Sequence, residues 1–181
     1  QAMEFFSGFA NVINAMRKSS KLIVGRVQGK AVGGGVGIAA AVDYCLATQY
    51  AGLKLSELAV GIGPFVVGPA VERKVGVGGL GELAIDATQF RTAEWGMQKG
   101  IYSNVYPTIE AMDEGISELL KTLTAQSVHA QSALKKALWS GCEDWDTLLL
   151  ERARISGKLV LKDESKSVIK SILEKKSQVA Q

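Results

Sequence analysis

The sequence predicts an α/β fold in which a glycine-rich core is followed by a helical region. Over residues 1–107, short apolar runs alternate with segments of helical periodicity, as in α/β proteins. Sixteen of the twenty glycines lie between Gly25 and Gly100, where they indicate tight turns and close backbone approaches. Beyond Pro107 apolar side chains recur every three or four residues, which predicts helices. We therefore expect a core over residues 1–107 and a helical region over 108–181.

The first half of the core is expected to run from a helix through a strand to a triple glycine. Large apolar side chains at helical spacing predict an amphipathic helix over residues 2–18. Residues 22–27 are an apolar, β-branched run typical of a buried strand, and residues 31–32 continue extended up to Gly33-Gly34-Gly35. The alanine-rich segment from Ile38 to Leu46 predicts a helix entered directly from these glycines.

The second half of the core is expected to hold two more strands and several helices. Residues 53–58 favour a strand, and helices are predicted over 66–74 and 80–87. Thr92 is typical of an N-cap for a helix that ends at Lys99, and residues 103–106 favour a last strand. The helical region should carry four apolar stripes, which need a partner surface (residues 109–123, 133–139, 145–155 and 168–173).

Composition excludes several classes of protein. The chain is 47% hydrophobic with a formal charge of +3, so it can bury a core and is not disordered. Basic residues outnumber acidic ones by only 10 to 7 over residues 1–100 and equal them beyond, which argues against nucleic-acid binding. No apolar run reaches the roughly 20 residues of a membrane helix. Cys45 and Cys142 lack metal-ligand spacing, which indicates a reduced, cytoplasmic setting without a metal site. The single histidine, His129, argues against histidine-based catalysis.

One glycine motif is expected to be structural. Residues 76–81 satisfy the pattern GxGxxG, which in dinucleotide-binding proteins follows a strand. Here it follows a predicted helix, and no acidic residue at a second strand end is apparent about 20 residues on. We therefore expect a turn between two helices. No GK[ST] follows any glycine cluster, which excludes a P-loop.

Two other features could carry chemistry, and each has a structural alternative. A strand that passes through Gly33-Gly34-Gly35 into a helix leaves backbone N–H groups free at the helix start. Such groups can stabilise an oxyanion, although a tight turn packed on neighbouring backbone would use the same residues. Glu57 lies between apolar residues, so its carboxyl could have a raised pKa and act as an acid or base. These residues by themselves favour the alternative, a solvated or ion-paired carboxylate at a strand end. Asp43, Glu72, Glu82 and Asp86 are expected on helices, as surface or structural acids.

The order of the motifs resembles the crotonase family, the enoyl-CoA hydratase/isomerase superfamily. The likeness rests on Val27-Gln28-Gly29-Lys30-Ala31-Val32-Gly33-Gly34-Gly35, Ala41-Val42-Asp43, Leu55-Ser56-Glu57-Leu58 and Gly61-Ile62-Gly63-Pro64, and it extends to Thr92-Ala93-Glu94. The resemblance implies a superhelix of ββα units that binds an acyl-CoA thioester, with a C-terminal trimerisation region. It implies chemistry that needs no metal or redox cofactor. Coenzyme A enters only as part of the substrate.

The resemblance also implies roles for individual residues. Gly34 matches one backbone donor of the family's oxyanion hole, and Glu57 matches a catalytic glutamate that moves a proton. The neighbouring residues are expected to contact the substrate (Gly33, Gly35, Gly37, Pro64 and Phe65). The helical region is expected to assemble the protein into a homotrimer or hexamer.

The sequence departs from the family pattern in two places. Gly37 stands where the family's hydratases carry their other glutamate, so the resemblance favours isomerase-like proton transfer by one carboxylate. A true hydratase that holds its water with other groups, and a non-catalytic acyl-CoA-binding homologue, remain alternatives. Family members also have a further segment before the helix at 2–18, which carries the second oxyanion donor. We therefore expect the chain to lack that N-terminal part.

Overall fold

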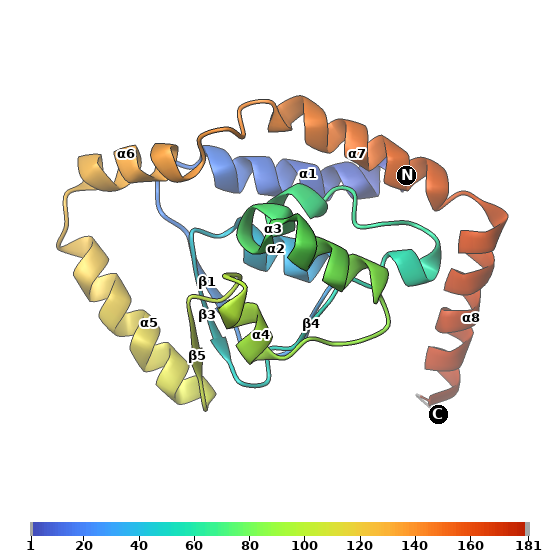
Figure 1. The fold of residues 1–181 in the computed structure, drawn as a ribbon, viewed down its shortest axis with the longest axis horizontal. Coiled ribbons are helices and arrows are strands. Elements are labelled where there is room, and N and C mark those ends of the chain that lie inside the picture. Colours follow the sequence, from blue (N-terminus) through green and yellow to red (C-terminus); the bar gives the residue numbers. More distant parts are fainter. Residues whose placement is uncertain (1, 180–181) are drawn as a thin grey trace.

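The computed structural model describes residues 2–179, with side chains as far as residue 174, and its core is built from two turns of a ββα superhelix (Figure 1). The first turn holds β1 (Val24–Val27), β2 (Ala31–Val32) and α2 (Gly34–Ala41). The second turn holds β3 (Tyr44–Thr48), β4 (Leu53–Lys54), the 3-10 helix η1 (Leu58–Val60) and α3 (Gly68–Ile85). Helix α1 (Ala2–Lys18) precedes the first turn, and α4 (Ala93–Gln98) leads into β5 (Asn104–Tyr106).

The strands of successive turns pair in parallel, which confirms the predicted ββα superhelix. One sheet has the order β1-β3-β5, in which Val24 faces Tyr44 and Leu46 faces Asn104. In the second sheet β2 pairs with β4, so that Ala31 faces Leu53. Each turn therefore brings its first and second strands over those of the turn before. This stacking places the start of α2 beside the segment that follows β4.

The predicted helix from Ile38 to Leu46 is too long, because α2 ends at Ala41 and β3 begins at Tyr44. Beyond its first residue β3 is fully buried and lies between two strands, so its sequence lacks the alternation of a half-buried strand. For that reason it is hard to distinguish from a buried helix. Asp43 therefore lies in the bend between the two elements and not on a helix, which corrects its predicted position.

Two further predictions about the core have different outcomes. The strand expected over residues 53–58 is shorter, because only Leu53–Lys54 pairs with β2 before the chain turns into η1. The two helices expected on either side of the GxGxxG motif form α3, which is interrupted at Gly76. Gly76 has φ +72° and ψ 169°, a conformation open mainly to glycine. The motif is therefore the predicted turn between helices.

In the described part of the helical region, helices α5 to α8 form an arch around the core (Figure 1). Helix α5 (Ile109–Thr124) packs against β3 and β5, and α7 (Trp145–Leu159) lies along α1. Helix α6 (Val128–Leu138) connects the two, and α8 (Asp163–Val179) descends on the far side of the molecule, where it contacts η1. Among the described residues no helix is long and apolar enough to cross a membrane.

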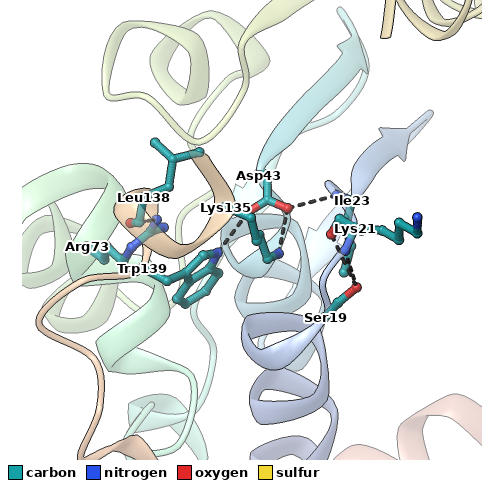
Figure 2. A network of polar contacts seen from close by, with 8 residues as sticks. All are labelled: Ser19, Lys21, Ile23, Asp43, Arg73, Lys135, Leu138 and Trp139. Carbon is teal, nitrogen blue, oxygen red and sulfur yellow. Dashed lines mark hydrogen bonds and ion pairs between the residues drawn. The ribbon is translucent and has the colours of Figure 1, made fainter. Parts of the chain in front are cut away.

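A buried polar network joins α6 to the core (Figure 2). The Asp43 carboxylate accepts hydrogen bonds from the backbone N–H of Ile23 at 2.8 Å, from Lys135 Nζ at 2.6 Å and from Trp139 Nε1 at 2.8 Å. The side chains of Lys135 and Asp43 are only 2% and 3% exposed. Arg73 stacks on the Trp139 ring, with its Cζ 4.0 Å from the ring centroid. Asp43 is thus the structural acid that the sequence predicted.

Candidate active site

A cavity of about 220 Å³ opens between α1, the start of α2 and the loop before α3. Most of its wall is apolar and comes from aromatic rings of α1 and from the loop at residues 63–67. The polar part of the wall comes from the glycine turn that enters α2, from the segment after β4 and from Ser156 of α7. The lining residues that matter below are Phe9, Gly33, Gly34, Ser56, Glu57 and Phe65.

The glycine turn presents free backbone donors at this cavity. Gly33 has φ +55° and ψ −117°, a conformation that only glycine adopts readily. Its own N–H donates a hydrogen bond of 2.8 Å to the Lys54 carbonyl. Gly34 and Gly35 are the first two residues of α2, so no helical turn precedes them to offer a carbonyl that could accept hydrogen bonds from their N–H groups. Within the described part of the chain neither donates to a protein acceptor. Gly34, whose N–H has no partner among the described residues, is one of the residues that line the cavity.

Two glycines of this segment are fixed by packing. A Cβ atom on Gly34 would collide with the ring of Phe9 on α1, and a Cβ on Gly37 would collide with the side chain of Val67. Gly34 thus allows the aromatic wall to lie directly on the backbone of α2. Gly37 is buried against Val67, so a larger side chain at position 37 requires Val67 to move.

Glu57 is positioned by the tight turn that follows β4. It immediately precedes η1, and its backbone carbonyl accepts hydrogen bonds from the N–H groups of Val60 at 3.1 Å and Ile62 at 3.0 Å. Its Oε2 atom is buried and has no hydrogen-bond partner among the described residues. Burial raises the pKa of this carboxyl above its ordinary value, and a hydrogen bond from its own backbone N–H offsets the rise only in part. Glu57 is therefore a carboxyl that can hold or release a proton closer to neutral pH than usual.

The carboxyl of Glu57 lies against the glycine turn. A Cβ atom built on Gly33 would be 3.0 Å from Glu57 Oε1, so the absence of a side chain at Gly33 makes room for this carboxyl. The next residue along the chain, Gly34, carries the free N–H. One wall of the cavity thus combines a hydrogen-bond donor for an oxygen atom with a group that can move a proton.

The loop before α3 supplies another part of the cavity wall. Gly63 has φ +151° and packs under the ring of Phe65, whose N–H donates to the Gly63 carbonyl at 2.8 Å. The Pro64 carbonyl accepts from the Gly68 N–H at 2.7 Å, which ties the loop to the first turn of α3. The loop therefore holds Phe65 in the cavity wall.

Comparison with known proteins identifies the family. The model of the family "Enoyl-CoA hydratase/isomerase" matches residues 1–179. The chain belongs to this family. No curated protein matches the sequence.

Solved structures of the enoyl-CoA hydratase/isomerase family share this fold. A structure described as an enoyl-CoA hydratase from Mycobacterium avium superimposes with a TM-score of 0.88 at 20% identity over 96% of this chain and 68% of that one. An enoyl-CoA hydratase from Bacillus halodurans gives a TM-score of 0.83 at 21% identity over 92% of this chain and 66% of that one. At these identities the likeness establishes the fold.

The structure brings together five of the seven residues that the sequence pointed to. Gly33, Gly34, Glu57, Pro64 and Phe65 all line the cavity. The other two residues predicted to contact substrate, Gly35 and Gly37, lie outside its lining, and Gly37 packs on Val67 instead.

Sequence reasoning missed the part of the wall that comes from helices. The amphipathic helix predicted over residues 2–18 includes Phe5, Phe6 and Phe9. All three line the cavity, and Phe5 meets the other two edge to face. Three phenylalanines within five residues were the available signal. Ser156 of α7 also lines the cavity, and no pattern in the sequence marked it.

Proposed function

We propose that this enoyl-CoA hydratase/isomerase family member binds an acyl-CoA thioester in the cavity and moves a proton through a thioester enolate. The observation that carries the proposal is the position of Glu57, whose buried carboxyl lies against the glycine turn that presents the free N–H of Gly34. In this arrangement the Gly34 N–H donates to the thioester oxygen, and Glu57 is the acid/base. Coenzyme A takes part only as the carrier of the acyl group.

The favoured reaction is the conversion of a 3-enoyl thioester into its conjugated 2-enoyl isomer. Ionised Glu57 removes a proton from C2, and the electron pair delocalises onto the thioester oxygen, where the Gly34 N–H stabilises the negative charge. The protonated Glu57 then returns the proton at C4, which leaves the double bond between C2 and C3. No atom is gained or lost. A raised pKa suits both steps, because the same carboxyl must be ionised in the first and protonated in the second.

A single carboxyl at the cavity favours proton transfer over addition of water. Among the described residues that line the cavity, Glu57 is the one acid. The position where the family's hydratases carry a second glutamate is Gly37, which is packed on Val67. Hydration is the second candidate, because Ser56 also lines the cavity and its hydroxyl could hold a water next to Glu57.

An absorbance assay separates these candidates. The purified protein is mixed in turn with a 3-enoyl-CoA and with crotonyl-CoA, and the absorbance of the conjugated enoyl thioester is followed. We expect a rise with the 3-enoyl-CoA and little change with crotonyl-CoA. A fall with crotonyl-CoA would instead assign hydration, and no change with either would assign a binding role. Glu72→Gln, on the exposed side of α3, is the matched control for variants of Glu57.

We also propose that the helical region mediates assembly into a homotrimer or hexamer. Its helices carry exposed apolar side chains that the core leaves uncovered, among them Leu134, Leu150 and Ile172. Light scattering on the purified protein tests this, and a monomer at micromolar concentration would reject it.

A further inference from the structure

Helix α8 touches the turn that carries Glu57 through one buried side chain. Over the residues of α8 whose side chains are described, Ser165 is the only buried position, with 1% of its surface exposed. Its hydroxyl donates a hydrogen bond of 3.0 Å to the backbone carbonyl of Gly61. Gly61 directly follows η1, and η1 is the core element against which α8 packs. A mostly solvated helix is thus docked onto the turn at Ser165.

The turn between Glu57 and Gly61 is closed by backbone hydrogen bonds. Glu57 accepts from Val60 and Ile62, and the Gly61 N–H donates to the Leu58 carbonyl at 3.1 Å. Gly61 adopts φ +73°, and a Cβ atom there would lie 2.6 Å from Ser165 Oγ. The absence of a side chain at Gly61 therefore serves two purposes, because it permits the left-handed conformation and it lets α8 approach the backbone.

The orientation of the Glu57 carboxyl depends on this turn. Its Oε2 atom has no hydrogen-bond partner among the described residues, so it is held by burial and by the backbone conformation and not by a neighbouring side chain. Burial raises the pKa of Glu57, the hydrogen bond from its own backbone N–H opposes the rise, and no charged group contributes. On the first turn of α8, Asp163 pairs with Lys166 at 3.7 Å, and Glu164 is exposed. Access of water is therefore the main variable that a looser turn would change.

We propose that Ser165 is a positioning residue for Glu57: by holding the Gly61 carbonyl, α8 fixes the turn and keeps the carboxyl buried beside Gly33. The consequence for turnover rests on the function proposed above, whereas the consequence for the carboxyl itself does not. Removing the hydroxyl frees the turn, admits water to Glu57 and brings its pKa down toward the ordinary value.

The test compares Ser165→Ala with Ser167→Ala, which removes an exposed hydroxyl from the same helix. Glutamate side chains are labelled with 13C, the Glu57 resonance is assigned with Glu57→Gln, and the carboxyl is titrated by NMR. Amide hydrogen exchange is measured over residues 58–62, with β3 as the check that the core is folded. We expect Ser165→Ala to lower the Glu57 pKa and to speed exchange at Val60 and Ile62. Ser167→Ala should change neither.

Turnover provides a separate readout. If Glu57 moves the proton, Ser165→Ala lowers kcat by up to about 100-fold, the loss that a misplacement of about 1 Å can cause. KM should change little. The acidic limb of the kcat profile should also move to lower pH. An unchanged Glu57 titration together with unchanged exchange over residues 58–62 would overturn the positioning role. A shifted titration in a protein that turns over no enoyl-CoA would support the positioning role and reject the proposed function, so the two failures are distinguishable.

Discussion

Two buried carboxyls lie at opposite ends of α2 and meet opposite environments. Asp43 follows the C-terminal end of the helix and accepts hydrogen bonds from Ile23, Lys135 and Trp139. Glu57 lies against Gly33 at the N-terminal end, and its buried Oε2 has no partner among the described residues. The two acids flank the same helix without belonging to it, and they differ in whether their oxygens are satisfied.

This difference separates an acid that holds the fold from one that is available for chemistry. A buried carboxylate surrounded by donors is stable as the ion, and removing one donor is costly. A buried carboxyl without such donors destabilises its own ionised form, which raises its pKa and leaves an oxygen free for a substrate proton. Burial alone therefore does not mark a candidate functional acid, whereas burial with an unsatisfied oxygen in a residue that lines a cavity does.

The largest expected effect is the loss of turnover in Glu57→Gln. The amide keeps the shape of the side chain and cannot take a proton, so kcat should fall by about 10²- to 10⁴-fold, the usual contribution of a general acid/base. Circular dichroism should show an intact fold, and Glu72→Gln should retain activity. Turnover at the wild-type rate would remove Glu57 from the mechanism.

The opposite behaviour is expected at Asp43. Lys135→Ala leaves the Asp43 carboxylate buried without its cation and should lower the free energy of unfolding by about 3–5 kcal/mol. Lys136→Ala, on the exposed side of α6, should change it by no more than about 0.5 kcal/mol. Urea unfolding measures both.

Adding Asp43→Asn to the Lys135→Ala variant should recover part of the lost stability, because no charge is then left unpaired. If the double variant is as unstable as the sum of the two single ones, the pair does not act as a unit.

A smaller loss is expected at the glycine that separates Glu57 from the backbone. Gly33→Ala places a Cβ where φ is +55° and within 3.0 Å of Glu57 Oε1, so we expect about 1–3 kcal/mol of strain and a displaced carboxyl. Both the melting temperature and kcat should fall. Gly29→Ala, where a Cβ would meet open space, is the control. Full activity in Gly33→Ala would show that Glu57 does not depend on this contact.

The smallest effect tests the sign of the Glu57 shift. Because the pKa of Glu57 is raised in the folded protein, the folded state holds this proton to higher pH than the unfolded state. Ionising Glu57 therefore costs stability as pH rises from the ordinary glutamate pKa through the raised one. Glu57→Gln should be more stable than the wild type at neutral pH, and the difference should vanish at pH values below the ordinary pKa. A variant less stable than the wild type at neutral pH would indicate that Glu57 has partners that stabilise its ionised form.

Most of the fold could be predicted from local signals, and the errors lie where local signals fail. The side chain of Thr92 accepts from the Trp95 N–H, as its predicted N-cap role requires. The first residues of β3, Tyr44 to Leu46, were mistaken for the end of a helix, because only pairing with two distant strands distinguishes a buried strand from a buried helix. The strand predicted over residues 53–58 ended early because β2 offers only two residues to pair with.

The part of the site that could be predicted is the part whose backbone conformation follows from the residue types. Gly33 and Gly34 mark the turn, whereas the apolar neighbours of Glu57 left its burial open and only the family resemblance pointed to this residue. The aromatic wall of α1 and the contact of Ser165 with Gly61 depend on which faces the tertiary fold brings together, and the latter joins residues 104 positions apart. Such contacts leave no local pattern.

Exchange of substrate hydrogen with solvent tests the central claim most directly. The protein is incubated with a 3-enoyl-CoA in D2O, and deuterium at C2 of the recovered substrate and at C4 of the product is measured by NMR. If Glu57 moves the proton beside the Gly34 N–H, the wild-type protein introduces deuterium at these carbons and Glu57→Gln does not. Equal incorporation by Glu57→Gln, or none by the wild-type protein, would contradict it.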